Sequence, residues 1–386
     1  MSIRALNCGV ECVGLSLHPS STHAAVGLID GSVQIWDYAA EDGGKEDKFK
    51  RVEEILQEDE KSSCRVVKYT DDGSYLFTGT GKHIRCFDRQ GSLVWEQPDA
   101  HPGAINCLYC INGEDGVFVS GDEEGEIKLW DIRKGTDPLT VSKEHSDYIA
   151  DMICCPEKKT LLTAAGDGRL GVYQMKMGFR KAVFKELSDE QDDDLLSLQI
   201  MYGGKKVIAG TQEGVLDIWN WGEWGDISDR FPGHPYSVEA LLKWDETTMI
   251  TGSSDGLIRV VNLFPNKLLG VIGDHKELPI ERLAWSHDRQ YVASVSHDSF
   301  VRFWDTSILH DEDDDEEEQE QEQEAVKNSE AKQEENSSDD EDDSSDEEQT
   351  KKKKKKKKKP VAKQEKPKYR NRPTKRAKTE AFYSDL

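Results

Sequence analysis

Hydrophobic and polar residues alternate with a period of two along most of the first 305 positions. The segments 127–130 (IKLW) and 301–304 (VRFW) show the alternation most clearly, and segments 105–110 and 117–120 are of the same kind. A period of two is that of a β-strand with one buried face, whereas an amphipathic helix has a period of 3.6. The pattern therefore predicts short β-strands joined by turns.

The strand pattern recurs at a regular interval. Strands that end in a large, mostly aromatic residue followed by a polar one occur seven times, at Trp36-Asp37, Phe87-Asp88, Trp130-Asp131, Tyr173-Gln174, Trp219-Asn220, Val261-Asn262 and Trp304-Asp305. The intervals between them are 51, 43, 43, 46, 42 and 43 residues. Four short strands in each of seven repeats are typical of a β-propeller. Because no single blade buries both of its faces, the ring must close to be stable.

A column of turn residues keeps the same interval. Five residues before the large residue the sequence has Gly31, Gly125, Gly168, Gly214, Gly256 and Ser299, and in four of these six cases Asp precedes it. Asp-Gly in this position is typical of a tight hairpin turn with a positive φ angle. The second repeat fits less well, because no His precedes it and its turn around Gly81 is one residue short.

Over residues 1–305 the repeat resembles the WD-repeat family. Four kinds of residue carry the resemblance: a His before the first strand, a turn Asp, a strand hydroxyl and a Trp. They are His101, His145, His234 and His275; Asp115, Asp245 and Asp288; Ser120, Thr251 and Ser294; and Trp130 and Trp304. The resemblance implies a seven-bladed propeller in which one blade is shared between both ends of the domain. Residues 2–7 are then expected to supply the outer strand of the last blade.

Charge is divided among three segments. The chain of 386 residues has 51 Lys+Arg and 76 Asp+Glu, a formal net charge of −25. Residues 1–310 carry −19, residues 311–350 carry −20 and residues 351–386 carry +14. All nine Trp and all eight Cys lie in the first segment, so only that segment can build a core. We expect an all-β propeller over 1–310, an acidic disordered segment over 311–350 and a basic disordered tail over 351–386.

Several classes of protein are excluded by the composition. The apolar runs are strand-sized, so we expect no membrane span. The start of the chain lacks the order of a secretory signal, and the cysteines sit in apolar segments, which favours a reducing compartment. Cys107 and Cys110 have the spacing of a zinc knuckle, but no second pair completes four ligands. We expect no metal and no cofactor.

The residues that look catalytic have a simpler interpretation. His275, Asp288 and Ser294 are of the types found in a nucleophile triad, but such residues recur with the repeat and would join a loop to a strand. The sequence has no phosphate-binding glycine loop, no HExxH and no nucleophile elbow. We therefore expect a monomeric propeller that is not an enzyme.

Candidate partner contacts lie where the chain departs from the repeat. Trp221 and Trp224 follow Trp219, where the repeat needs one large residue, so they are candidate partner anchors; the alternative is that they cover an apolar patch of their own blade. Tyr148 joins this candidate surface. Topology places it among rim residues that precede inner strands: Glu11, Tyr148, Asp194 and Ser237.

Other stretches resemble one subgroup of the family. They lie at 145–152, 163–168, 226–231, 255–266 and 381–386. The resemblance implies a nucleolar protein that supports ribosomal RNA synthesis and processing, with ribosome biogenesis factors as partners.

A second resemblance concerns Trp130-Asp131-Ile132-Arg133. With Asp122, it resembles the box by which some WD-repeat proteins dock on the adaptor of cullin-RING ubiquitin ligases. The apolar part of the box is the blade pattern itself, so Arg133 and Asp122 carry the information. A substrate receptor of such a ligase is one alternative function, and a histone-binding chaperone module that uses the acidic segment is another.

The tail offers two further sets of candidates. Ser337, Ser338, Ser344 and Ser345 each have an acidic residue three positions on, the context preferred by acidophilic kinases. A dense cationic run fits recognition by a nuclear import receptor and weak, sequence-independent RNA contact. Its residues are Lys351, Lys352, Lys353, Lys354, Lys355, Lys356, Lys357, Lys358 and Lys359, with Lys375, Arg376 and Lys378 further on. We thus expect a protein of the nucleus and nucleolus, with a cytoplasmic pool as the alternative.

Overall fold

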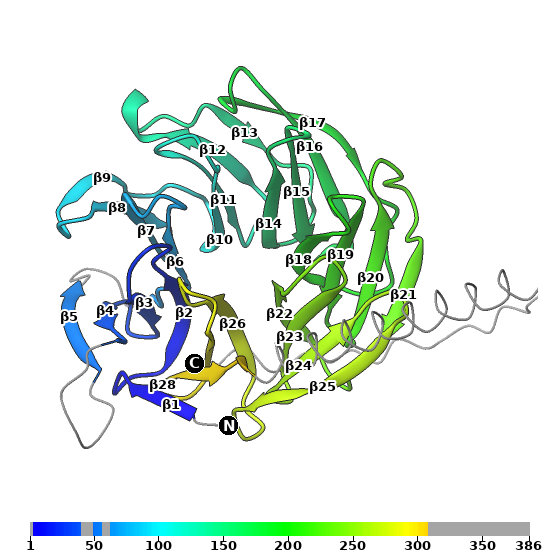
Figure 1. Ribbon diagram of the computed structural model, residues 1–386. Helices are drawn as coiled ribbons and strands as arrows, with labels where there is room; N and C mark the ends of the chain where they lie inside the picture. Colours follow the sequence, from blue (N-terminus) through cyan, green and yellow to red (C-terminus); the bar gives the residue numbers. More distant parts are fainter. Residues whose placement is uncertain (1–2, 40–48, 56–61, 308–386) are drawn as a thin grey trace, which may run out of the picture. The chain divides into compact units, whose positions relative to one another are not determined.

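Seven four-stranded antiparallel sheets form a closed ring in the computed structural model, which describes residues 3–39, 49–55 and 62–307 (Figure 1). Blade 1 contains β2 (Cys12–Leu17), β3 (His23–Leu28), β4 (Val33–Asp37) and β5 (Lys50–Ile55), and blade 2 contains β6 (Val66–Tyr69), β7 (Tyr75–Thr80), β8 (His83–Asp88) and β9 (Leu93–Gln97). Blade 3 contains β10 (Ile105–Cys110), β11 (Val117–Asp122), β12 (Ile127–Asp131) and β13 (Thr140–Ser142), with the 3-10 turn η1 (Ile132–Lys134) between the last two. The predicted seven-bladed propeller is confirmed.

The remaining blades have the same order of strands. Blade 4 contains β14 (Ile149–Cys155), β15 (Thr160–Ala165), β16 (Leu170–Lys176) and β17 (Lys181–Leu187), and blade 5 contains β18 (Leu195–Met201), β19 (Lys206–Thr211), β20 (Val215–Asn220) and β21 (Asp229–Pro232). Blade 6 contains β22 (Val238–Lys243), β23 (Thr248–Ser253), β24 (Leu257–Asn262) and β25 (Lys267–Asp274). Blade 7 contains β26 (Ile280–Trp285), β27 (Tyr291–Ser296), β28 (Phe300–Asp305) and, from the other end of the chain, β1 (Ile3–Asn7). The described part of the chain contains no helix with the length and apolar character of a membrane span.

The inner strands β2, β6, β10, β14, β18, β22 and β26 surround the centre of the ring (Figure 1). We call the end of the propeller at which these strands begin the top face, and the opposite end the bottom face. Turns between the second and third strands of a blade lie at the top, and turns between the first and second strands lie at the bottom. Successive blades therefore present loops of the same kind at each end.

Hydrophobic side chains fill the spaces between blades. Each of the seven buried clusters takes its residues from two neighbouring blades. Polar groups near the inner strands also join neighbours, as where Tyr69 N donates to Ser16 Oγ and Leu198 N donates to Asp151 Oδ2. Burial of apolar surface thus depends on the presence of both adjoining blades.

The turn glycines adopt the backbone angle that the sequence predicts. Gly168 has a φ of 70° and Gly214 a φ of 86°. A Cβ on Gly168 would lie 2.7 Å from Gln191 O, in the loop that leads to the next blade. Glycine is therefore required both for the turn and for the close approach of that loop. Blade 2 forms four regular strands in spite of its short turn, with Thr80 paired to His83.

The ring closes through the N-terminal strand. Pairing of β1 with β28 runs from Ile3 opposite Trp304 to Asn7 opposite Phe300. Leu6 is fully buried in the cluster shared by blades 7 and 1. The contact between the two ends of the propeller is thus both a sheet edge and part of the core.

Replacing Leu6 by Ala should destabilise the whole ring, because it opens a cavity at the closure. We expect the free energy of unfolding to fall by about 2–5 kcal/mol, measured by urea denaturation. Deleting residues 1–9 should lower the thermal melting temperature further. Ala5→Ser is the control, because Ala5 is exposed on the same strand. A truncated chain that melts like the full one would contradict the role given to β1.

Candidate functional site

A buried chain of hydrogen bonds joins two strands and a loop in blade 3. The Trp130 indole Nε1 donates to Ser120 Oγ at 2.8 Å, and the same hydroxyl lies 2.6 Å from His101 Nε2. The other nitrogen of the same imidazole, His101 Nδ1, lies 3.4 Å from Asp122 Oδ2. An indole can only donate, so Ser120 accepts from Trp130 and has its own proton left for His101. Blade 7 repeats the arrangement with Trp304, Ser294, His275 and Asp298.

Blades 4 and 6 keep part of this chain. His145 Nε2 lies 2.7 Å from Thr163 Oγ1, and its Nδ1 lies 3.0 Å from Asp167 Oδ2. In blade 6 the pair is His234 and Thr251, at 2.8 Å. The columns of histidines and strand hydroxyls predicted from the repeat are therefore confirmed as hydrogen-bonded structural pairs.

The predicted column of turn aspartates does lie in turns, but not beside the histidines. Asp115, Asp245 and Asp288 lie in turns at the bottom face, where Asp288 accepts from Ser286 Oγ and Asp245 accepts from Thr247 N. The aspartates that reach the histidines are Asp122, Asp167 and Asp298, at the ends of the second strands or in the turns after them. The histidines precede the inner strands, so only an aspartate at the top end can reach them.

The chemistry of these chains is that of a structural contact. His275 is fully buried, and burial lowers the pKa of both His234 and His275 to about 4. Each imidazole is therefore neutral near pH 7. Ser294 Oγ is occupied by both Trp304 and His275, and its side chain has no exposure to solvent. The apparent triad of serine, histidine and aspartate thus holds a loop against a strand.

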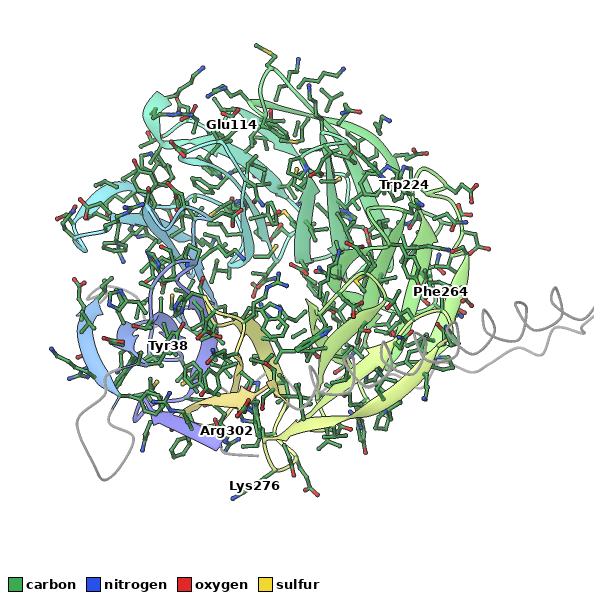
Figure 2. The ribbon with its side chains drawn as sticks, viewed as in Figure 1. Tyr38, Glu114, Trp224, Phe264, Lys276 and Arg302 are labelled. Atoms are coloured by element: carbon green, nitrogen blue, oxygen red, sulfur yellow. The ribbon has the colours of Figure 1, made fainter. Side chains whose placement is uncertain are left out.

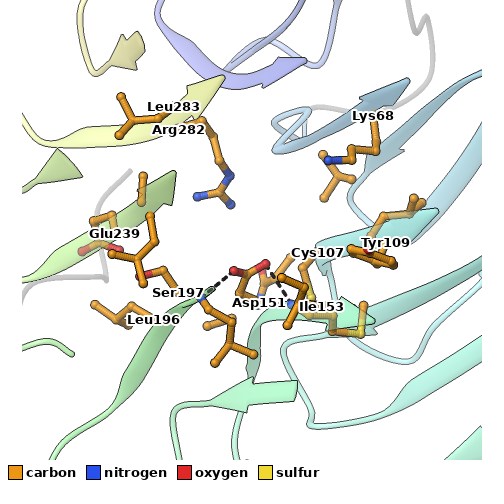
Figure 3. A pocket seen from close by; sticks show the side chains of 18 of the residues that line it. Lys68, Cys107, Tyr109, Asp151, Ile153, Leu196, Ser197, Glu239, Arg282 and Leu283 are labelled. Carbon is orange, nitrogen blue, oxygen red and sulfur yellow. Dashed lines mark hydrogen bonds between the residues drawn. The ribbon is translucent and has the colours of Figure 1, made fainter. Parts of the chain in front are cut away.

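The centre of the ring contains a cavity of about 280 Å³ that is lined by all seven inner strands. Asp151, Arg282 and Lys68 point into it from three blades (Figure 3). Asp151 accepts hydrogen bonds from Leu198 N and Met152 N, both at 2.8 Å, and burial raises the pKa of its carboxyl group. Arg282 donates to Glu281 O at 2.7 Å. The cavity wall therefore carries charges of both signs.

A histidine between two carboxylates lies at the top of the seam between blades 7 and 1. His297 Nδ1 lies 2.8 Å from Glu11 Oε1, and its Nε2 lies 2.7 Å from Glu281 Oε1. The hydrogen bond to Glu281, together with the two negative charges, raises the pKa of His297 to about 9. The imidazolium form is therefore held at neutral pH, where it links the two ends of the ring.

The top face carries exposed apolar groups among acidic residues. Tyr236 is 60% exposed and Leu278 is 38% exposed, in the loops before β22 and β26. Tyr148 is half-buried, and its hydroxyl donates to Asp194 Oδ2 at 3.1 Å. Other rim carboxylates belong to Glu123, Asp147, Asp193, Glu213 and Glu277. Ser237, also on this rim, donates to Glu239 Oε1. An exposed aromatic residue surrounded by carboxylates suits a partner segment with positive charge.

The extra tryptophans are largely inside the molecule, contrary to their interpretation as exposed anchors. Trp224 is 6% exposed in the cluster shared by blades 4 and 5, and Trp221 packs against it with ring centroids 5.1 Å apart. The structure favours the alternative, that they cover an apolar patch, but the patch is shared by blades 4 and 5 and does not belong to their own blade alone. Trp221 keeps some exposure, and Lys158 Nζ lies 3.9 Å from its ring centroid.

The residues of the predicted adaptor box differ in their exposure to solvent. Asp122 and Trp130 are buried in the blade 3 chain described above, so neither is available to a partner. Arg133 is 48% exposed, and its Nε donates to Asp131 Oδ1 at 2.8 Å. Arg180 also reaches Asp131, at 3.3 Å. A partner that binds the Arg133 guanidinium would have to compete with Asp131.

The cysteines and the tail complete the set of predicted sites. All eight cysteines are buried, and the described residues contain no group of His, Cys, Asp or Glu that could hold a metal ion. The candidates on the tail lie outside the described residues: Ser337, Ser338, Ser344, Ser345, the run 351–359, Lys375, Arg376 and Lys378.

Sequence reasoning missed Asp151 and Arg282 at the centre of the ring, and His297 at the seam between blades 7 and 1. Asp151 interrupts an otherwise apolar inner strand. A charged residue at that strand position was the available signal. Its partners could be identified only once the ring brought the blades together.

Comparisons with known proteins agree with this fold. A family model described as WDR55 matches residues 4–309. WD repeat-containing protein 55 of Rattus norvegicus is 39% identical over 298 residues, which cover 77% of this chain and 74% of the relative. The protein of the same name from Homo sapiens is 38% identical over 298 residues, with coverage of 77% and 74%. That from Arabidopsis thaliana is 36% identical over 303 residues, with coverage of 78% and 82%. The subgroup resemblance predicted from the sequence is confirmed.

Acid should destabilise the propeller through its buried histidines. Because the folded-state pKa values of His234 and His275 lie below the unfolded value of about 6.5, stability is complete above pH 6.5 and is lost as the pH falls through about 4. The loss should be on the order of 3 kcal/mol per histidine. Urea denaturation between pH 7.5 and 4 measures it. The double variant His234→Gln/His275→Gln should be less stable at pH 7.5 but lose less on acidification. An equally steep loss in both proteins would contradict the assignment.

Alkali should weaken the seam at His297. Its folded-state pKa is raised to about 9, so its contribution is complete below pH 6.5 and is lost as the pH rises through 9. We expect the difference in unfolding free energy between wild type and His297→Gln to be present at pH 6 and absent at pH 10. Glu213→Gln, on the same face but away from the seam, is the matched control. A difference that persists at pH 10 would show that His297 acts through packing alone.

Proposed function

Because the chain belongs to the WDR55 family of WD-repeat proteins, we propose that it is a non-enzymatic scaffold that supports ribosomal RNA synthesis and processing in the nucleolus. Its partners in this role are ribosome biogenesis factors, held through contacts between proteins. Propeller folds serve many functions, so the argument for this one depends on the surfaces that the blades present.

The proposed function depends most on the side chains of the top face. Tyr236 and Leu278 project from loops before neighbouring inner strands, and carboxylates such as Glu213 and Glu277 surround them. Aromatic residues at the centre of a contact contribute most of its binding energy, and complementary charge directs the approach. The factors that assemble on ribosomal RNA need basic segments to contact its phosphates, and such segments suit an acidic face.

The tail supports the nucleolar location. Residues 351–386 carry a charge of +14, and nine consecutive lysines begin at Lys351. A dense cationic segment of this kind is typical of recognition by a nuclear import receptor and of retention on nucleic acid. We assign this segment to targeting, and the propeller to the binding of partners.

The alternatives stay predictions. Docking on a ligase adaptor would depend on Arg133, whose guanidinium is already engaged by Asp131. A histone-binding role would depend on the acidic segment 311–350, outside the described residues. Loss of an adaptor in pull-downs with Arg133→Ala, or of histones after deletion of 311–350, would support them.

Tyr236→Ala combined with Leu278→Ser should abolish the scaffold role without changing localisation. In cells whose own gene is deleted, we expect this variant to enter the nucleolus normally but to let ribosomal RNA precursors accumulate several-fold, measured by pulse labelling. Its affinity for partners should fall at least tenfold, because the central aromatic contact is lost.

Val141→Ser is the matched control, since Val141 is 52% exposed on an outer strand away from the top face. It should restore normal processing. Normal precursor levels in cells that lack the protein altogether would overturn the proposed function, and normal levels with the double variant would overturn the assignment to the top face.

A further inference from the structure

A group of lysines and aromatic residues lies on the bottom face of blades 4, 5 and 6. We call it the lysine–aromatic surface, and it consists of Lys158, Lys159, Lys176, Met177, Phe179, Lys205, Lys206, Trp221 and Phe264. These residues come from the turns and strand ends at the bottom of three blades that follow one another in the ring (Figure 1). Figure 2 labels Phe264 at the outside of blade 6 and Trp224 on blade 5 beside it.

Two of the lysines are held against aromatic rings. Lys158 Nζ lies 3.9 Å from the Trp221 ring centroid and also donates to Gly204 O in the next blade. Lys206 Nζ lies 4.9 Å from the Phe264 ring centroid and donates to Asn220 Oδ1 at 2.6 Å. These contacts fix the two ammonium groups, and neither forms an ion pair with a carboxylate of the described residues.

The surface is cationic within an acidic propeller. Among the described residues, no carboxylate forms an ion pair with any of its five lysines. Three nearby acids have other hydrogen-bond or ion-pair partners: Glu246 pairs with Lys243 at 2.6 Å, Glu223 accepts from Asn220 Nδ2 at 2.8 Å, and Glu157, beside Lys158, accepts from Cys155 Sγ at 3.3 Å. Residues 1–310 carry a net charge of −19, so a group of lysines here differs in sign from the rest of the propeller. Such a positive surface attracts an anionic ligand.

The backbone is strained at the same place. Five bulky residues of this region have φ angles between 50° and 63°: Lys159, Met177, Phe179, Tyr202 and Phe264. Residues with a Cβ seldom adopt this left-handed conformation, and such strain gathers where a side chain is held for binding. Met177 is 75% exposed, beside a hollow of about 440 Å³ that Lys159, Lys176 and Phe179 help to line.

We propose that the lysine–aromatic surface binds single-stranded RNA. The lysines contact successive phosphates, while unpaired bases stack on Phe264 and enter the hollow beside Met177 and Phe179. Stacking groups among cations are the arrangement that binds single strands, because every base has an aromatic face. The contacts come from the ends of turns, among them the turn of the β16–β17 hairpin, and the described parts of blades 4, 5 and 6 contain no helix that could enter a duplex groove. An acidic protein segment would contact the lysines but has no bases to place in the hollow, so the hollow favours RNA.

This surface is independent of the partner site on the top face. The two lie at opposite ends of the inner strands, so protein and RNA can be held at once. The inference goes beyond the proposed function, because it gives the propeller itself a direct contact with RNA in addition to the predicted contact through the tail.

The test measures binding of fluorescein-labelled oligouridine of 20 nucleotides by fluorescence anisotropy, at salt from 50 to 200 mM. The full chain is used with its own tail and with serines in place of the nine lysines 351–359. In the second background, Lys159→Gln/Lys176→Gln/Lys205→Gln should weaken binding about tenfold at the lower salt. The slope of log affinity against log salt should fall by about 2, since each phosphate contact contributes about 0.7. Phe264→Ala should weaken binding about fivefold with an unchanged slope.

The matched control is Lys82→Gln/Lys185→Gln/Lys276→Gln, which removes the same charge from exposed lysines elsewhere. It should leave the affinity and slope nearly unchanged. Equal weakening by the two triple variants would overturn the proposal, because only net charge would matter. If Lys159→Gln/Lys176→Gln/Lys205→Gln binds oligouridine as before but no longer binds a peptide of residues 311–350, the proposal is overturned in favour of an acidic protein ligand. Neither result bears on precursor accumulation with the top-face variant, so the two proposals fail separately.

Discussion

The structure depends on the burial of apolar surface between neighbouring blades. A four-stranded sheet with two apolar faces cannot be stable alone in water, and here every buried cluster is completed by residues of the adjoining blade. Stability is therefore a property of the closed ring. Hydrogen bonds between inner strands, such as Ser197 Oγ to Val238 O at 2.8 Å, add to this packing but do not replace it.

This constraint decides which residues are free to function. The faces of the blades are occupied by packing, and the serine–histidine chains are occupied by holding loops, so contact with other molecules is left mainly to the two ends and the outer edge. The ends differ in chemistry. Tyr236 stands among carboxylates at the top, whereas Lys158 and Lys206 stand against aromatic rings at the bottom. A net charge for the whole propeller hides this difference.

Much of the fold could be predicted from the sequence, because a repeated local pattern determines it. The period of two, the seven large residues and the turn glycines such as Gly168 are all local, and each led to the observed element. Asp288 does lie in a turn, but its spacing did not show that this turn is at the bottom of blade 7, where Asp288 accepts from Ser286 and not from His275. The burial of Trp224 could not be predicted locally, because part of the cluster that covers it comes from blade 4. The site residues Asp151 and Arg282 are 131 positions apart, and no local pattern relates them.

The pairing of β1 with β28 also has a consequence for how the chain is made. A ribosome synthesises Ile3 about 300 residues before its partner Trp304, and translation proceeds at roughly 5–20 residues per second. The first strand must therefore wait for tens of seconds with an unpaired edge, while up to six blades emerge without a closed ring. During that interval the nascent chain exposes apolar surface on blade 1 and on the latest blade, which are the surfaces that molecular chaperones bind. The strand pairing that closes the finished ring thus leaves the chain most exposed to aggregation while it is being synthesised.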